Sequence, residues 1–331
     1  MSCDTPEAVL QLARQFMESR ILLTAAELGL FSPLAKKPHT AEQLSGRLGC
    51  DTRALAILLD ALAAMGLLEK RDGAYRTPPA AAPFLCGGSP RSVIPMILHA
   101  AHLWERWSDL TPIVRATSSS AAPASGARST EELSAFIGAM HIAGLPLAEK
   151  IVAAIRPGQA RNLLDVGGAS GTYTIAFLRA APGMKATLFD RPEVIPMARE
   201  RLAEAGVLDR VRLEAGDFHR DELPGGHDLA LLSAIIHQYS PQENRELFGK
   251  VSRALVPGGR IVIRDHIMDP DRTQPRDGAI FAVNMLVNTR GGSTYTFEEV
   301  RAWLEGTGFA NVRFLQKGER MDGLVEAFKR G

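Results

Sequence analysis

Residues 162–171 read Asn162-Leu-Leu-Asp-Val-Gly-Gly-Ala-Ser-Gly171, an apolar run that ends in a glycine-rich turn. The run predicts a buried strand, and the glycines predict a sharp turn into a helix over 172–180. The same alternation continues to the end of the chain, so we expect an α/β fold with a mostly parallel sheet and helices on both faces. Further strands are expected at 185–190, 211–214, 227–233 and 260–264, helices at 194–205, 242–255 and 297–306, and two closing strands between 312 and 328.

Acidic residues mark the ends of the first three strands, where ligands of such sheets bind. Asp165 leads the glycine turn, as a ligand with an ammonium group requires, and Asp190 stands where ribose hydroxyls are bound. Gly216-Asp217-Phe218 offers an acceptor and an aromatic face to an adenine. The turn fits the dinucleotide pattern poorly and is not a phosphate loop. Together these residues predict a cationic nucleoside such as S-adenosylmethionine, whereas a glycine turn alone could be purely structural.

The first ninety residues predict helices followed by a hairpin, which is a winged-helix pattern. Helices are expected over 7–28, 40–49 and 52–65, with a hairpin over 67–77. Nine Lys/Arg and nine Asp/Glu cancel within residues 1–90, and the third helix offers almost no polar side chains to base edges. We therefore expect a module that packs two subunits together. A ligand-responsive DNA-binding protein is the less favoured alternative.

The composition is that of an ordinary globular protein. The chain has 331 residues, a net charge of +1 and 46% hydrophobic residues, so we expect no nucleic-acid partner. Its three scattered cysteines predict a reducing, cytoplasmic environment. The N-terminal sequence does not have a signal-peptide pattern, and the most apolar run, 93–104, is too short to span a bilayer. The expected parts are a dimerisation domain over 1–90, a helical linker over 91–150 and a cofactor-binding domain over 151–331.

The motifs LLDVGGASG, FDRPEVI and EAGDF, with the stretches 231–265 and 291–309, resemble the S-adenosylmethionine-dependent small-molecule O-methyltransferases. These include plant caffeate-type enzymes and bacterial natural-product and carotenoid relatives. The resemblance covers nearly the whole chain. It implies a class I methyltransferase (Rossmann-like) seven-stranded sheet with an antiparallel last strand, and an all-α/winged-helix front end that forms an intertwined homodimer. The expected cofactor-binding residues are Asp165, Gly167, Gly168, Gly171, Asp190, Arg191, Asp217, Phe218 and, near the methionine end, Ser233.

His237 follows the fourth strand and is the candidate general base. A phenol or enol is a poor nucleophile until its proton leaves, and an imidazole accepts protons near neutral pH. The resemblance assigns this role to His237 and matches Asp265 to one of two acids that orient it. Thr294 stands where the second acid is usual, and Gln238 replaces the usual aspartate. These departures leave open carbon, nitrogen or sulfur methylation and chemistry without methyl transfer, and a lone histidine here could merely satisfy backbone groups.

The family's acceptor pocket is built from the middle helices and the segment after the fifth strand. An apolar cleft with few polar groups suits a flat aromatic or polyketide-like acceptor. His99 and His102 have no acid or cysteine beside them at ligand spacing, so no metal site is expected. The loop 117–126 is either a surface loop or a lid over the acceptor. The candidate acceptor-contacting residues are Trp104, Phe136, Met140, His141, His266, Phe281, Met285 and Asn288.

Overall fold

The computed structural model describes residues 4–89, 91–116 and 129–331. The chain divides into two compact units, Met1–Glu105 with Thr130–Ile142 and Arg106–Ser129 with Ala143–Gly331. The domain boundaries expected at residues 90 and 150 stay predictions, because two helices of the middle segment each contribute to both units. The predicted loop 117–126 lies outside the described residues.

The N-terminal unit begins with short helices whose ends are set by local sequence. Thr5 caps the amide of Ala8, and a Thr40–Gln43 capping box opens the helix that Gly49 closes in the left-handed conformation. The expected helix over 7–28 is two helices, because the chain tightens at Gln15, whose amide bonds to the carbonyl of Leu12. The elements are α1 (Pro6–Arg14), α2 (Phe16–Glu27), α3 (Phe31–Lys36), α4 (Ala41–Leu48), α5 (Thr52–Ala64), β1 (Glu69–Arg71), β2 (Ala74–Arg76) and α6 (Ala82–Leu85).

The hairpin of this unit turns at Asp72 and Gly73, both with positive φ, as a two-residue hairpin loop requires. Behind it lies a small apolar core, in which Leu30, Leu34 and Leu59 are fully buried. The helix α3 contributes to this core and was not expected from the sequence.

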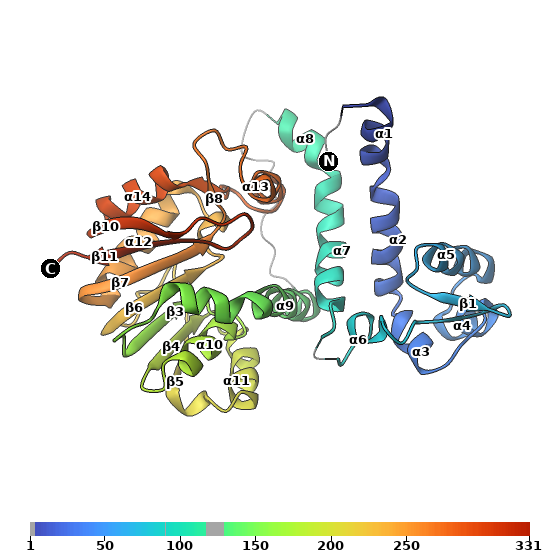
Figure 1. Cartoon of the computed structure of the whole chain (residues 1–331), viewed down its shortest axis with the longest axis horizontal. Helices are drawn as coiled ribbons and strands as arrows, with labels where there is room; N and C mark the ends of the chain where they lie inside the picture. Colours follow the sequence, from blue (N-terminus) through green and yellow to red (C-terminus); the bar gives the residue numbers. More distant parts are fainter. Residues whose placement is uncertain (1–3, 90, 117–128) are drawn as a thin grey trace. The chain divides into compact units, whose positions relative to one another are not determined.

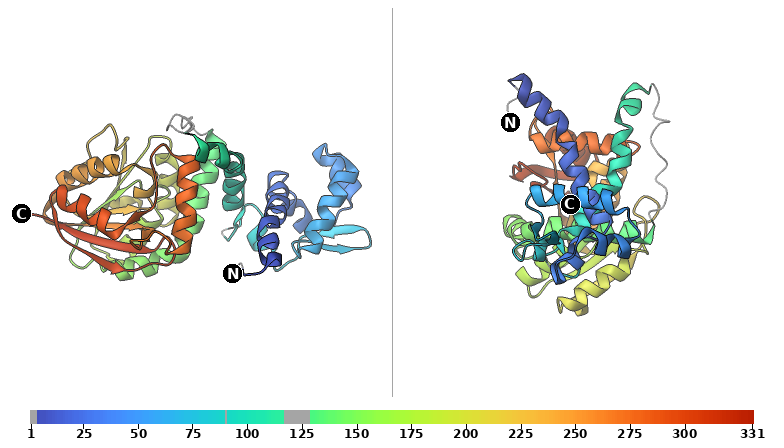
Figure 2. Two further views of the ribbon diagram at one scale, coloured as in Figure 1. Left: turned by 90° about the horizontal axis from the view of Figure 1, so that it is seen from above. Right: turned by 90° about the vertical axis from the view of Figure 1, so that its right-hand side faces the viewer.

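The larger unit contains a seven-stranded sheet in the order β10-β11-β7-β6-β3-β4-β5. Its central strands are parallel, and the last strand of the chain runs antiparallel to β7, which confirms the predicted class I methyltransferase sheet. The β10–β11 hairpin closes one edge (Figures 1 and 2, in red). The strands are β3 (Asn162–Val166), β4 (Lys185–Asp190), β5 (Val211–Ala215), β6 (His227–Ser233), β7 (Leu255–Asp265), β10 (Phe309–Gln316) and β11 (Gly323–Lys329).

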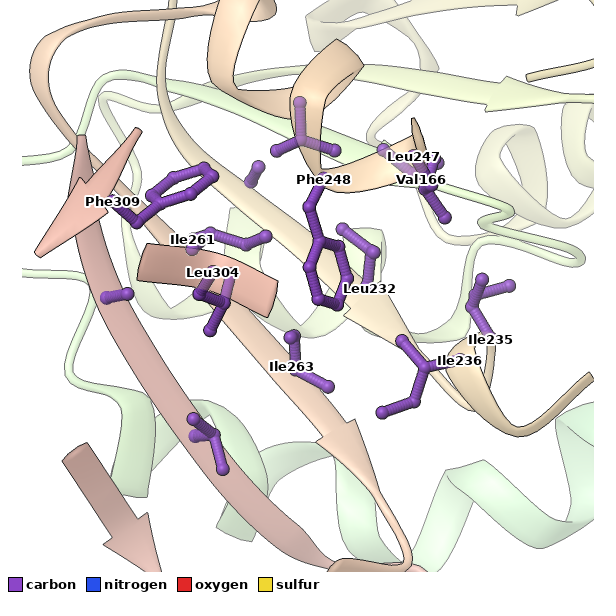
Figure 3. Close-up of a cluster of buried hydrophobic side chains, with 14 of the residues drawn as sticks. Val166, Leu232, Ile235, Ile236, Leu247, Phe248, Ile261, Ile263, Leu304 and Phe309 are labelled. Carbon is purple, nitrogen blue, oxygen red and sulfur yellow. The ribbon is translucent and has the colours of Figure 1, made fainter. Parts of the chain in front are cut away.

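Each face of this sheet is covered by helices. One face packs against α10 (Thr172–Ala180), α11 (Ile195–Glu204) and the last turns of α9 (Thr130–Ile155). The other packs against α12 (Pro241–Ala254) and α14 (Phe297–Gly306). Figure 3 shows Phe248 of α12 lying on the strand residues Leu232, Ile261 and Ile263. Burial on both faces explains why the strands are nearly continuous apolar runs.

The remaining elements of the chain include some that the sequence did not predict. A helix over Arg276–Asn288 (α13) and a two-stranded sheet of β8 (Ile267–Met268) and β9 (Tyr295–Thr296) were not expected. The remaining elements are α7 (Ile94–Ser108), α8 (Leu110–Arg115), and the 3₁₀ turns η2 (Leu208–Arg210) and η3 (Ile236–Gln238).

Residues 132–155 of α9 are long and apolar enough to cross a membrane by length and composition alone. This helix, and not the run at 93–104, is therefore the one to consider as a span. Its end packs into the sheet core through Ala148, Ile151 and Ile155, as the core helix of a globular protein does.

Candidate active site

The glycine turn between β3 and α10 brings bare backbone to the carboxyl edge of the sheet. Gly167 and Gly171 have φ values of +69° and +77°, in the left-handed region that favours glycine. A Cβ on Gly168 would lie 2.7 Å from Cγ of Leu188 and 3.0 Å from the carboxylate of Asp165. The turn therefore has no room for a side chain at Gly168, and a ligand can approach the backbone closely.

The two acids beside this turn have different local partners. The hydroxyl of Thr174 donates to Oδ2 of the fully buried Asp165 at 2.6 Å. Burial raises the pKa of Asp165 to about 6, with a smaller contribution from the charge of Asp190. The carboxylate of Asp190 accepts the amides of Ala169 and Arg191, each at 2.7 Å. Asp190 thus ties β4 to the glycine turn, and its remaining lone pairs are available to two vicinal hydroxyls.

An aromatic group lies at the end of β5, beside Asp217. The rings of Phe218 and Tyr239 meet edge to face at 5.5 Å, and His219 lies 4.2 Å from Tyr239. Burial raises the pKa of Tyr239, and the charges of Asp217 and Asp190 add to that rise. Tyr239 was not singled out in the sequence, although it is an aromatic residue two positions after His237.

His237 and Asp265 form a buried pair. The 3₁₀ turn η3 carries His237, whose Nδ1 donates to the two carboxylate oxygens of Asp265 at 2.8 and 3.0 Å. Burial raises the pKa of Asp265, but His237 and the amide of His266 together lower it below its usual value, so Asp265 is ionised. Because the proton resides on Nδ1, the Nε2 atom of His237 is left as an acceptor.

Aromatic and polar side chains of α13 and of the residue after β7 lie in the same unit as this pair. Phe281 lies 4.9 Å from the ring of His237 and 5.1 Å from that of His266. Burial lowers the pKa of His266, so it is neutral at pH 7. Met285 is buried and follows Phe281 by one helical turn, whereas the side-chain amide of Asn288 donates back to Asn284. Four of the predicted acceptor residues therefore lie in one compact unit with His237.

The departures from the family pattern have defined structural roles. The amide of Gln238 donates to the carbonyl of Ala234, so its side chain supports the turn after β6. Thr294 is buried, and its carbonyl accepts from Arg272. A Cβ on Gly292 would lie 2.4 Å from the carbonyl oxygen of His237, so a glycine is required for this loop to approach η3.

The other four predicted acceptor residues belong to the N-terminal unit. Trp104 lies under the guanidinium of Arg20, and the ring of Phe136 meets that of His99 at 5.3 Å. Their contribution to an acceptor pocket, with that of Met140 and His141, stays a prediction.

Ser233 is held by the neighbouring strand. Its hydroxyl accepts from Nη1 of Arg264 at 3.1 Å. Arg264 was not singled out in the sequence, although a charge inside the run Ile261-Val-Ile-Arg-Asp265 is unusual.

Two family models match the chain. The O-methyltransferase domain model covers residues 117–310, and the O-methyltransferase dimerisation domain model covers residues 10–86. The chain belongs to the O-methyltransferase family. The enzyme is 34% identical to a 3-hydroxy-5-methyl-1-naphthoate 3-O-methyltransferase of Streptomyces sahachiroi, over 93% of this chain and 90% of that one. It is 33% identical to the tetracenomycin polyketide synthesis 8-O-methyl transferase TcmO of Streptomyces glaucescens, over 93% and 92%.

Among solved structures, human N-acetylserotonin methyltransferase in complex with S-adenosylmethionine superposes with a TM-score of 0.84 at 25% identity. The match covers 100% of each chain. The enzyme is thus an S-adenosylmethionine-dependent O-methyltransferase of small molecules. The side chains fit this cofactor: a bare glycine turn, an acid for the ribose and an aromatic group for the adenine. The described residues contain no group of three or more His, Cys, Asp or Glu that could hold a metal ion.

Proposed function

We propose that the enzyme methylates a phenolic hydroxyl of a flat aromatic acceptor, with His237 as the general base and Asp265 as the residue that orients it. The contact between Nδ1 of His237 and the carboxylate of Asp265, at 2.8 Å, carries this proposal. It sets the tautomer and leaves Nε2 able to accept the proton of the acceptor.

In the proposed reaction the acceptor hydroxyl gives its proton to Nε2 of His237 as its oxygen attacks. Bound S-adenosylmethionine supplies the sulfonium methyl group, and S-adenosylhomocysteine leaves. The ionised Asp265 stabilises the imidazolium that forms, because an opposite charge in a buried site favours the charged form. Phe281 packs edge-on against His237 and limits the access of water to the pair.

The acceptor class follows from the side chains near the base. Phe281 and Met285 offer apolar contact, and the neutral His266 can exchange a hydrogen bond with a ring substituent. One relative is named for the 3-hydroxyl of a naphthoate and another for the 8-O-methylation in tetracenomycin polyketide synthesis, which supports an aromatic or polyketide-like acceptor here.

The proposal is tested by incubating the enzyme with S-adenosylmethionine and a panel of phenols, naphthols, hydroxyquinolines and aromatic polyketides. Mass spectrometry should find a product one methylene heavier, and S-adenosylhomocysteine should form in equal amount. S-adenosylhomocysteine formed without a methylated product, or a product methylated at carbon, nitrogen or sulfur, contradicts the proposed reaction.

We also propose that the N-terminal unit is a winged-helix module that pairs two copies of the chain in the cytoplasm, without binding DNA or a membrane. The dimerisation domain match over residues 10–86 and the equal numbers of acids and bases in 1–90 support this. A gel shift at low salt checks the DNA alternative, because nonspecific duplex binding is strongest there. A retarded duplex contradicts the proposal.

A further inference from the structure

Arg264 is a buried cation without an anion. It lies near the end of β7 and exposes 5% of its surface. Among the residues that the structure describes, its guanidinium makes one hydrogen bond, to Ser233, and its Nε has no partner. A buried charge is costly unless it is paired and hydrogen-bonded. Among the described residues, no carboxylate forms an ion pair with this guanidinium.

Arg260, four residues earlier on the same strand, shows how this protein satisfies such a group. Its Nη1 donates to the carboxylate of Glu326 at 3.1 Å and to the carbonyl of Ile155, and its Nη2 donates to the carbonyl of Arg156. Both arginines lie on the same face of β7, because side chains alternate along a strand. The contrast indicates that the missing partner of Arg264 is a ligand and not a side chain.

A second unsatisfied group lies against the first. The ring of Tyr173, in the first turn of α10, packs under the guanidinium of Arg264 at 5.1 Å. Its hydroxyl is buried and has no hydrogen-bond partner within the described part of the chain. Burial raises the pKa of Tyr173, the charge of Arg264 and the hydroxyl of Ser233 lower it, and the charges of Asp165 and Asp322 raise it further. Tyr173 and Arg264 thus supply donors to one small volume beside Ser233.

The order of the strands identifies the ligand group that reaches this volume. The nucleoside-binding side chains Asp217 and Asp190 end β5 and β4, the glycine turn follows β3, and Ser233 and Arg264 end β6 and β7. Neighbouring strands are about 4.8 Å apart, so β4 and β6 are separated by about 10 Å. That is about the distance from the ribose hydroxyls to the carboxylate in an extended S-adenosylhomocysteine. A ligand lying along this edge brings its amino-acid end to Arg264.

We propose that Arg264, Tyr173 and Ser233 bind the α-carboxylate of S-adenosylmethionine and S-adenosylhomocysteine. This rests on the proposed placement of the cofactor along the carboxyl ends of the strands. Two N–H donors of a guanidinium match a carboxylate, and such charge-assisted bonds are the strong ones. The buried carboxylate of Asp165, on the same side of the sheet, is the complementary partner for the α-ammonium group.

The test compares two ligands that differ in one group. One is S-adenosylhomocysteine, and the other is S-adenosyl-3-thiopropylamine, the same molecule without its carboxylate. Isothermal titration calorimetry gives the Kd of each for the wild type, Arg264→Met and Arg260→Met. Wild type should bind S-adenosylhomocysteine about 10- to 100-fold more tightly than the amine, and Arg264→Met should bind the two about equally. Arg260→Met, the matched control, should keep the wild-type ratio.

The outcomes separate this proposal from the proposed function. If wild type binds neither ligand, the cofactor assignment itself fails. If wild type prefers S-adenosylhomocysteine but Arg264→Met keeps that preference, the carboxylate site is wrong and the cofactor assignment stands. Arg264→Met could instead keep the wild-type ratio of the two Kd values and show a higher KM for the acceptor. That result would mean that Arg264 binds an anionic group of the acceptor, and it also overturns the proposal.

Tyr173→Phe provides a second variant if Arg264→Met does not fold. It should raise the Kd for S-adenosylhomocysteine about 3- to 10-fold and leave the Kd for the amine unchanged, because the hydroxyl contacts only the carboxylate of the ligand. An unchanged affinity for S-adenosylhomocysteine in Tyr173→Phe overturns the assignment of that hydroxyl.

Discussion

At the scale of single residues, Asp165 has a structural role, and in the proposed placement of the cofactor it also binds the α-ammonium group. Its folded pKa of about 6 lies above the usual 3.8, so the folded protein binds the extra proton between these values. The free energy of unfolding therefore falls as pH rises through this window, by about 3 kcal/mol from this group alone. Binding the cofactor's ammonium group offsets this cost, since a nearby cation favours the ionised carboxylate.

Asp165→Asn tests this account of the buried acid. The ligand-free variant should be more stable than wild type at pH 7, by about 1–3 kcal/mol, because Thr174 can still donate to the amide oxygen while no charge is buried. Its stability should change less with pH between 4 and 6, and its Kd for S-adenosylhomocysteine should rise. Chemical denaturation at several pH values measures this. A variant less stable than wild type at every pH contradicts it.

Asp265→Asn tests the orientation of His237. The amide can donate to Nδ1 and so shift the proton to Nε2, which removes the acceptor that faces the substrate. We expect kcat to fall about 10²- to 10⁴-fold while the Kd for S-adenosylhomocysteine changes less than about twofold. An equal loss of binding and turnover would indicate that the site had collapsed, and full turnover would exclude the orienting role.

The residues that could be predicted from sequence are those with a signature at a strand end. Asp190 and His237 follow apolar runs, and their types match the chemistry expected there. Tyr239 and Arg264 depend on partners from other strands and helices, which no local pattern reveals. Arg264 also lies within a buried, apolar strand, where charged residues are rare, so its position gave no sign of a binding role.

At the scale of elements, the glycine turn depends on close packing between β3, α10 and β4. In Gly168→Ala the new methyl group would meet the fully buried Leu188 and the carboxylate of Asp165. We expect a loss of about 1–3 kcal/mol in stability and a weaker affinity for S-adenosylhomocysteine. Thermal denaturation and calorimetry measure both.

Gly249→Ala is the matched control for this substitution. Gly249 lies inside α12, and the nearest atom to an added Cβ is Nη1 of Arg253 at 3.6 Å. An alanine there should raise stability by about 0.5–1 kcal/mol through helix propensity and leave ligand binding unchanged. If Gly168→Ala behaved like Gly249→Ala, the turn would have more room than the structure gives it.

The helix α13 shows why some elements could not be predicted. It contains Gly278, two asparagines and two valines, which are weak helix formers. Its stability comes from packing: a Cβ on Gly278 would lie 2.5 Å from Sδ of Met268, so helix and β8 are in close contact. The residues Phe281, Met285 and Asn288 were nevertheless identified as one group, because the family resemblance placed them after the fifth strand.

At the scale of the whole molecule, the sheet could be predicted because apolar runs typical of strands alternate along the sequence with segments typical of helices.

The pairing of subunits is a second property at this scale. Val9, Leu10, Phe16 and Met17 on α1 and α2 are each about half exposed, although they are apolar. Leu10, Phe16 and Met17 lie within the matched dimerisation domain, and such exposed apolar residues are expected to be covered by a second copy.

Phe16→Asp with Met17→Asp should therefore convert dimers to monomers, because two charges in an apolar interface are costly to bury. Sedimentation velocity measures the change. Val256→Asp, at an exposed apolar position outside the matched dimerisation domain, is the control and should leave the dimer intact. A wild type that is monomeric at micromolar concentration, or a double variant that stays dimeric, contradicts this interface.

The central claim is that His237 removes a proton from the acceptor during methyl transfer. The most direct test measures kcat/KM for wild type and His237→Asn with a series of substituted phenols or naphthols of increasing acidity. A general base matters less when the acceptor is already ionised. The loss of kcat/KM in His237→Asn should therefore be about 10²- to 10⁴-fold for the least acidic acceptor and should decrease steadily until the most acidic acceptor shows almost no loss. A loss that is the same for every acceptor, or absent from all of them, would contradict the assignment of His237 as the base.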